Sequence, residues 1–299
     1  VTCVATSVAT EEAARALGLR VEDAASVERL DLAIDGADQI APDWWLVKGG
    51  GAAHTREKVV AEMESLGLLE KIEDNPMTGE RIYLYDTTLR DGAQTQGVDF
   101  SVADKAAIAR ELDLLGIDYI EGGWPGANPT DDRFFADPPE FRNSKFVAFG
   151  MTRRAGRSAA NDPGLSAILQ TKARNVCMVG KTWDFHVDVA LEVDRAEYLG
   201  MIEDSIAYAG TKVEEVMFDA EHFFDGYKAN PDYALACAEE AHRAGARWVV
   251  LCDTNGGSLP NEVGRIVSEV IAAGIPGERL GVHCHNDPES AVPNPLAAV

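Results

Sequence analysis

Short apolar runs alternate with longer amphipathic stretches along the chain from Tyr83 onward. This order is typical of a parallel sheet whose strands are joined by crossover helices. Helices are predicted between most of the runs, for example over 102–115 after a Ser101 cap, and over 233–244 after Asn230 and Pro231. The predicted strands are residues 82–86, 119–123, 145–150, 175–179, 215–219, 248–253 and 281–285.

The fold class that follows is α/β, with a TIM (β/α)8-type barrel. Closure of such a barrel needs eight strands, so the sequence predicts a barrel truncated after its seventh strand. The last stretch, 289–299, falls where the seventh helix is expected. Pro293 and Pro295 lie within it. Because proline disrupts a helix interior, we expect an interruption there.

The first part of the chain does not follow the alternating pattern. Residues 1–63 contain an apparent helix at 11–17, a strand at 30–34 and a glycine-rich turn at 48–51. Residues 64–76 are charged and end in the turn signal Asn75-Pro76. We therefore predict a small α/β fragment over 1–63, a linker over 64–76 and the barrel over 77–299.

Composition narrows the classes of function. With 46% hydrophobic residues and no apolar run of the ~18 residues that a membrane span needs, a soluble cytoplasmic protein is expected. The five cysteines have no paired spacing and are expected to be reduced thiols. A formal net charge of −23 argues against nucleic acid or an anionic membrane as partner. Any bound phosphate or CoA then needs a locally positive site.

Candidate metal ligands gather at the ends of two predicted strands. His283 and His285 are two residues apart, so their side chains share one strand face. The first strand leads into Asp86 to Gly92, which places Arg90 and Asp91 at the same rim. One carboxylate and two imidazoles suit Mg²⁺, Mn²⁺ or Zn²⁺ and leave positions for substrate oxygens. The alternative interpretation is a merely polar rim.

Three motifs carry a family resemblance. They are the run from Tyr83 to Phe100 containing Asp-Thr-Thr-Leu-Arg-Asp-Gly, the run Ile120-Glu-Gly-Gly-Trp-Pro-Gly126, and His283-Cys-His-Asn-Asp287. Together they resemble the acyl-CoA-condensing barrel family of isopropylmalate, homocitrate and citramalate synthases. Ala93 and Trp124 stand where isopropylmalate synthases have an acidic residue and a phenylalanine, which favours the citramalate type.

The resemblance implies acetyl-CoA and pyruvate as substrates, (R)-citramalate and CoA as products, a divalent metal cofactor, and a place in isoleucine biosynthesis. It also implies that full-length relatives form homodimers. By position, Asp91, His283 and His285 would be the metal ligands, and Arg90 would lie beside the reacting carbonyl. In that family an asparagine further along the chain completes the set of metal ligands, and the present sequence has no counterpart of it.

Further candidates follow other strands. Glu221, with His222 beside it, is the candidate base that removes a methyl proton from the acetyl group, although a solvated loop carboxylate is the alternative. Glu121 and Thr254 are candidate substrate contacts, and a strand-to-helix cap is the alternative for Thr254. Asp86 is a candidate for supporting the metal site, and Asp253 for supporting Thr254 at the substrate. Lys181 and His186 are candidates for a phosphate contact or a base.

A second resemblance covers the first 63 residues. Leu32 to Asp38 and Lys48 to Lys58 are similar to an interior piece of ribose-5-phosphate isomerase A. In that family Asp35, Asp38, Lys48 and Glu57 would line the site. The phosphate-binding turn that should precede this piece is missing, so we expect no isomerase activity.

Four hypotheses of function remain. The first is a citramalate synthase-type acyltransferase, and the second is an isopropylmalate or homocitrate synthase, or a related lyase working in reverse. The third, from a different class, is a catalytically impaired fusion fragment. The fourth and lowest-ranked is ribose-5-phosphate isomerase activity.

Overall fold

The computed structural model describes residues 81–286 and 290–299, together with 2–4, 15, 20–22, 39–40 and 46–47 near the N-terminus. The chain divides into two compact units, Val1–Ile82 and Tyr83–Val299, and each is described by itself. In the first unit, β1 (Thr2–Val4) pairs in parallel with β2 (Arg20–Glu22), and β3 (Gln39–Ile40) pairs antiparallel with β4 (Leu46–Val47). The predicted strand at 30–34, the glycine turn and the linker lie outside the described residues.

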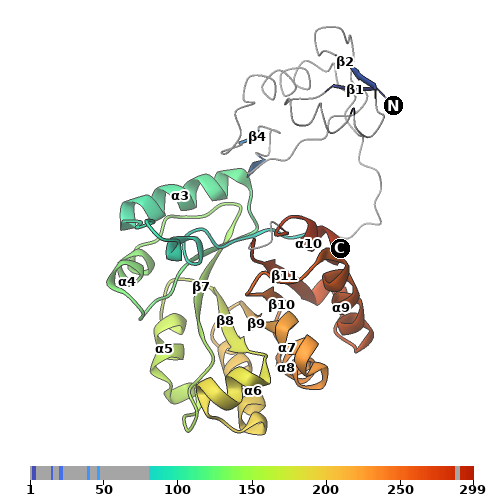
Figure 1. The fold of residues 1–299 in the computed structure, drawn as a ribbon. Coiled ribbons are helices and arrows are strands. Elements are labelled where there is room, and N and C mark those ends of the chain that lie inside the picture. Colours follow the sequence, from blue (N-terminus) through green and yellow to red (C-terminus); the bar gives the residue numbers. More distant parts are fainter. Residues whose placement is uncertain are drawn as a thin grey trace. The chain divides into compact units, whose positions relative to one another are not determined.

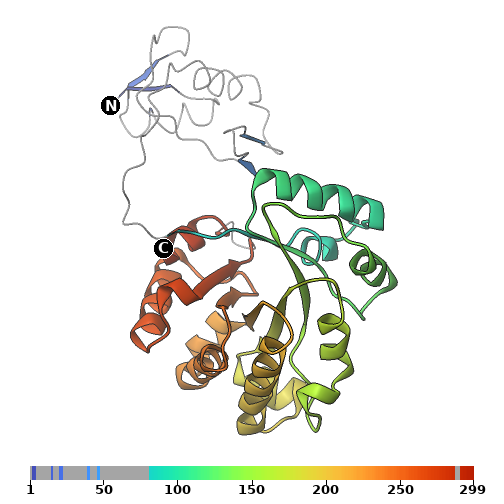
Figure 2. The same ribbon diagram turned by 180° about the vertical axis from the view of Figure 1, so that it is seen from behind.

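The second unit is built on seven parallel strands in the order β11-β10-β9-β8-β7-β6-β5. The sheet curls, and helices cover its outer side (Figures 1 and 2). This is the α/β architecture that the alternating pattern predicts. The strands are β5 (Tyr85–Asp86), β6 (Tyr119–Gly123), β7 (Lys145–Met151), β8 (Asn175–Lys181), β9 (Glu215–Glu221), β10 (Trp248–Asp253) and β11 (Leu280–Cys284).

The helices follow the strands in the order of a β/α fold. Among the described helices, none combines the length and apolar character that crossing a membrane requires. A π-helix, His186–Leu191, lies between β8 and α6. The α-helices are α3 (Val102–Leu115), α4 (Pro129–Ala136), α5 (Pro163–Leu169), α6 (Arg195–Gly210), α7 (Phe223–Ala229), α8 (Pro231–Arg243), α9 (Pro260–Ala272) and α10 (Pro293–Ala298).

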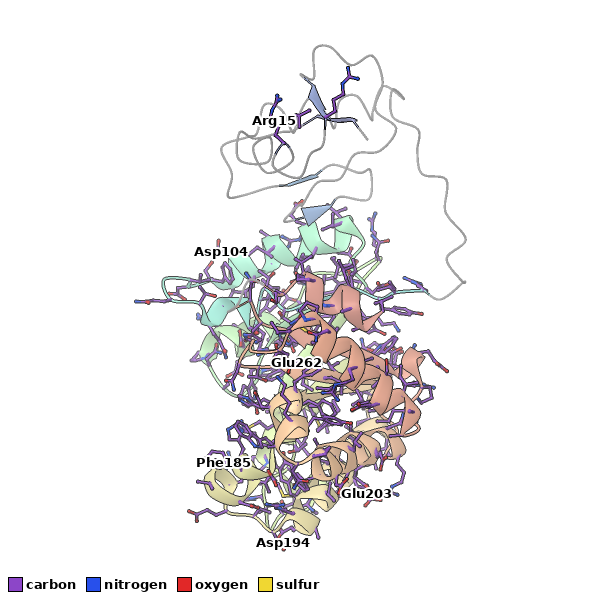
Figure 3. The ribbon with its side chains drawn as sticks, turned by 45° about the vertical axis from the view of Figure 1, so that its right-hand side comes forward. Arg15, Asp104, Phe185, Asp194, Glu203 and Glu262 are labelled. Atoms are coloured by element: carbon purple, nitrogen blue, oxygen red, sulfur yellow. The ribbon has the colours of Figure 1, made fainter. Side chains whose placement is uncertain are left out.

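Helix starts agree with their sequence signals. Ser101 accepts a hydrogen bond from the Asp104 backbone N–H, and the Asp104 carboxylate accepts one from the Ser101 N–H. Asp194 caps α6 by accepting from the backbone of Ala196 and Glu197. Figure 3 labels both acidic residues at their helices. These bonds satisfy backbone N–H groups at the helix starts that have no partner within the helix.

Successive side chains along each strand point to opposite faces of the sheet, so apolar residues pack in two separate layers. Phe218 and Ala220 of β9 pack in the larger core between sheet and helices, whereas Met217 packs in a smaller cluster on the inner face. Because side chains alternate across a strand, Asp219 and Glu221 share the inner face with Met217. The inner face therefore presents polar groups at the carboxyl ends of the strands.

The amino ends of the strands are covered by aromatic rings. Tyr83 lies 5.1 Å from Trp248 between ring centroids, and Trp248 donates to the Tyr119 hydroxyl at 3.1 Å. That hydroxyl donates in turn to Glu215 at 2.9 Å. These contacts link residues near β5 to β6, β9 and β10 at the amino ends of the strands.

Two local predictions need correction. The first strand is limited to Tyr85–Asp86, because the Leu84 N–H donates to the Asp118 side chain instead of to a strand backbone. The prolines of the last stretch do not prevent a helix. Pro293 begins α10 and Pro295 lies in its first turn, where the missing N–H group has no intrahelical partner to lose.

Asp113 joins α3 to the start of β7. Its carboxylate accepts backbone N–H groups of Arg142, Asn143 and Ser144 at 2.8 to 3.1 Å. Burial alone would raise the pKa of Asp113, but these hydrogen bonds hold it below the usual value.

Asp113→Asn is therefore expected to lower the free energy of unfolding by about 1–3 kcal/mol at neutral pH, because an amide replaces an acceptor of several bonds. A depressed folded-state pKa stabilises the fold above the unfolded value of about 4, and this contribution disappears as the pH falls through the folded value. Chemical denaturation should show the difference from wild type at neutral pH and its loss in acid. Glu111→Gln, on an exposed position of α3, is the control, and equal effects of the two variants would contradict the assignment.

Candidate metal centre

A tight turn after β5 places Arg90 and Asp91 at the carboxyl rim. The backbone N–H groups of Arg90, Asp91 and Gly92 all donate to the Thr87 carbonyl at 2.9 to 3.1 Å. The side chain of Asp86 accepts from the Thr88 N–H and hydroxyl at 2.9 and 3.0 Å. Asp86 therefore shapes the turn that carries Asp91, and its predicted support of the metal remains a prediction.

The three predicted ligands converge. The Asp91 Oδ2 atom lies 3.4 Å from His283 Nε2 and 3.5 Å from His285 Nε2. The two imidazole rings stack with centroids 5.1 Å apart. Ligand atoms about 2.1 Å from one ion are about 3.0 Å apart at a right angle and about 3.4 Å apart at the tetrahedral angle. The separations therefore fit a shared divalent cation.

The electrostatics also suit a cation. A hydrogen bond with His283, assisted by the charge of Arg90, lowers the pKa of Asp91 to about 2. Burial alone would lower the pKa of His283, but the contact with Asp91 and the charge of Asp219 raise it. A neutral imidazole is the form that binds metal, so protons and the cation compete for this nitrogen.

Arg90 is held in a fixed orientation beside Asp91. Its Nε donates to Glu121 Oε2 at 2.8 Å, and its Nη1 donates to Asp91 Oδ1 at 3.2 Å. The guanidinium carbon lies 3.9 Å from the centroid of the Phe149 ring. The fully buried Glu121 also accepts from the Tyr85 hydroxyl at 3.1 Å. Glu121 therefore orients Arg90, while its predicted contact with substrate remains a prediction.

Burial raises the pKa of Glu121 to about 7, although Arg90 opposes the shift. Burial raises the pKa of Asp219 in the same way, against the charges of His283 and Arg90. Asp219 and Cys252 each offer a ligand atom within 4.8 Å of one on His283. The sequence analysis did not single out Asp219 as a residue of the candidate metal centre. The signal was available, since Asp219 precedes Glu221 by two residues and shares its strand face.

A second polar group lies at the ends of β8, β9 and β10. Glu221 forms an ion pair with Lys181, and the His222 backbone N–H donates to Thr254 Oγ1 at 2.9 Å. The His186 ring lies 4.5 Å from that of His222, and burial followed by the charge of His222 lowers the pKa of His186. His222 has a left-handed backbone with φ of 56°, a conformation that non-glycine residues rarely adopt.

The predicted site residues thus fall into two groups. Arg90, Asp91, Glu121, His283 and His285 form the first, around the candidate cation position. Glu221, Thr254, Lys181 and His186 belong to the second. The hydroxyl of Thr254 does not cap α9, which begins six residues later, so the alternative of a strand-to-helix cap is wrong.

Asp253 lies at the end of β10, and its predicted support of Thr254 remains a prediction. Its carboxylate accepts from the Ser258 backbone N–H at 3.0 Å and from the Ser258 hydroxyl at 3.1 Å. It therefore fixes the loop after β10. The isomerase-like candidates Asp35, Asp38, Lys48 and Glu57 lie outside the described residues.

Comparison with known proteins supports the resemblance. Residues 81–299 match the family model described as HMGL-like, and residues 2–65 match that of ribose 5-phosphate isomerase A. The (R)-citramalate synthase of Aquifex aeolicus is 50% identical over 222 residues, which are 74% of this chain and 42% of the relative. The 2-isopropylmalate synthase of Solidesulfovibrio magneticus is 33% identical over 73% of this chain and 42% of the relative.

This chain spans about two fifths of the length of these curated relatives. Among solved structures, hydroxymethylglutaryl-CoA lyase from Pseudomonas aeruginosa superposes with a TM-score of 0.61 at 22% sequence identity, covering 73% of this chain and 72% of the lyase. That likeness supports the barrel-type fold. The curled parallel sheet, the three converging ligands and a family match over most of the chain agree, and the chain belongs to the HMGL-like family.

Proposed function

We propose that this chain carries an acyl-CoA-condensing site that joins acetyl-CoA to pyruvate, giving (R)-citramalate and CoA. The observation that carries the proposal is the convergence of Asp91, His283 and His285 beside a fixed Arg90. The 50% identity to (R)-citramalate synthases favours pyruvate over bulkier keto acids. On the basis of the same sequence identity, we include a role in isoleucine biosynthesis in the proposal.

Asp91, His283 and His285 would hold a divalent cation, Mg²⁺, Mn²⁺ or Zn²⁺. When bound, such an ion polarises the ketone of an α-keto acid. Arg90 places a guanidinium next to Asp91, where it can stabilise negative charge that develops on the ketone oxygen. Because Glu121 and Phe149 fix this guanidinium, little reorganisation is needed when the charge appears.

Glu221 would remove a proton from the methyl group of acetyl-CoA, and the resulting carbanion would attack the ketone carbon of pyruvate, whose oxygen takes up a proton to become the hydroxyl of the product. Water then cleaves the thioester and releases CoA as the free thiol. Lys181 holds the Glu221 carboxylate, and the Thr254 hydroxyl fixes the backbone at His222 next to it. Both contacts favour a defined position for the base.

Thiol release from acetyl-CoA tests the proposal directly. The chain, supplied with Mn²⁺ or Mg²⁺, is assayed with pyruvate, 2-oxoisovalerate and 2-oxoglutarate in turn. We expect the highest kcat/KM with pyruvate, by at least about tenfold, because a site shaped for a methyl group excludes larger side chains. Absence of a preference for pyruvate would contradict the assignment. No release with any of the three would favour the catalytically impaired fragment.

A further inference from the structure

A buried ion pair that the proposed reaction does not use joins α3 to α4. It consists of Lys105 and Asp131, whose side chains are only 5% and 8% exposed. Replacing such a pair by apolar side chains of similar size is often neutral or stabilising, so stability alone does not account for it. The further hydrogen bonds of the two side chains indicate what else the pair does.

The pair holds the backbone on both sides of Gly123, at the carboxyl end of β6. The Lys105 Nζ atom donates to the Gly122 carbonyl at 3.0 Å, and Asp131 Oδ2 accepts from the Trp124 N–H at 2.8 Å. The register of β6 with β7 shifts here, and Gly123 has a φ of 144°. A Cβ at Gly123 would lie 2.5 Å from Asp131 Cγ, so the carboxylate packs directly on this backbone. The ion pair therefore fixes the shape of an irregular strand end.

This strand end leads to Arg90 in two ways. Glu121, which precedes Gly122, accepts a hydrogen bond from Arg90 Nε at 2.8 Å. The Trp124 ring meets the Phe149 ring at 82° with centroids 5.4 Å apart, and the Phe149 centroid lies 3.9 Å from the guanidinium carbon. The two groups that orient Arg90 are thus each connected to the backbone that the ion pair holds.

We propose that Lys105 and Asp131 are positioning residues for Arg90, and that they act through Glu121 on one side and Trp124 on the other. The inference rests on the role of Arg90 in the proposed function, but the orientation of Arg90 can be measured without substrate. A pair with a merely structural role would affect the stability of the fold. A positioning pair also affects the hydrogen bond from Arg90 to Glu121.

The Arg90 Nε–H group reports this orientation in a nitrogen–proton correlation spectrum of the 299-residue chain. With Mg²⁺ and no substrate, this hydrogen-bonded group should give a slowly exchanging signal, which Arg90→Lys identifies by its absence. The variant Lys105→Met/Asp131→Asn removes both charges and keeps an acceptor for the Trp124 N–H. In it we expect the Arg90 signal to shift and to exchange with water about tenfold faster.

Two further variants complete the test. Lys172→Met/Asp137→Asn is the matched control, because the same two residue types form an exposed pair there. It should keep the wild-type signal, and an equal shift in this control would overturn the positioning role. Trp124→Leu leaves the ion pair in place but removes the ring contact with Phe149. It should also shift the Arg90 signal, and it decides the question if the first variant does not fold.

Kinetics connect the orientation of Arg90 with the proposed reaction. Lys105→Met/Asp131→Asn should lower kcat for pyruvate-dependent thiol release by about tenfold with little change in KM, since Arg90 acts on charge that develops during the reaction. In an Arg90→Lys background the same two substitutions should have little further effect. An equal loss in both backgrounds would overturn the inference, because the ion pair would then act by a route that does not include Arg90.

The outcomes distinguish this inference from the proposed function. An Arg90 signal that keeps its wild-type position and exchange rate in every folded variant of the ion pair and of Trp124 would overturn the positioning role. Thiol release by the wild-type chain would still support the proposed function in that case. A shifted signal together with no thiol release by the wild-type chain would support the positioning role and contradict the catalytic proposal.

Discussion

Arg90→Lys is expected to lower kcat/KM for pyruvate-dependent thiol release by about a hundredfold to a thousandfold, the usual loss when a fixed donor to a developing oxyanion is removed. The guanidinium donates to Glu121 and Asp91 through two different nitrogens and stacks on Phe149. One ammonium group cannot reproduce this planar arrangement. Because lysine keeps the positive charge, a loss of activity would be due to the changed geometry of the hydrogen-bond donors.

Steady-state kinetics with pyruvate as the varied substrate measure the effect, and Arg133→Lys on an exposed position of α4 is the matched control. A parallel Glu121→Gln variant should lose part of the same activity, because Glu121 acts by holding Arg90. The double variant should then lose less than the product of the two single effects. An unchanged kcat/KM in Arg90→Lys would contradict a role of Arg90 in the reaction.

The sequence was sufficient for the order of the elements. All seven strands were predicted at their positions, and α3 has the predicted bounds because its Ser101 cap and the glycine after Leu115 mark both ends. The first strand was predicted too long. Apolar character alone suggested that Ile82 belonged to it, but an edge strand has one neighbour, and Ile82 is 60% exposed.

The site could be predicted in part. Period-two alternation and the rule that parallel strands end at one rim were enough to bring Asp91, His283 and His285 together. Contacts between side chains of different elements were not predictable, since they depend on how those elements pack. The ion pair of Glu221 with Lys181 and the buried pair of Lys105 with Asp131 join residues that no local pattern relates.

Glu221→Gln is expected to reduce condensation by about a hundredfold to ten-thousandfold, the range typical for loss of a general base. The amide keeps the shape of the side chain but cannot accept the proton, and it loses the charge that pairs with Lys181. The decisive measurement is exchange of the acetyl-CoA methyl protons in deuterated water, followed by mass spectrometry. We expect wild type to incorporate deuterium and Glu221→Gln to do so at a strongly reduced rate.

Since Glu221 lies outside the group of candidate metal ligands, Glu221→Gln should retain Mn²⁺ binding in equilibrium dialysis. Glu239→Gln, exposed on α8, controls for the loss of one negative charge. Retained exchange in Glu221→Gln would assign proton removal to another group, and His186 or His222 at the same rim would be the next candidates. A loss of exchange together with loss of Mn²⁺ binding would instead show that Glu221 acts through the metal centre.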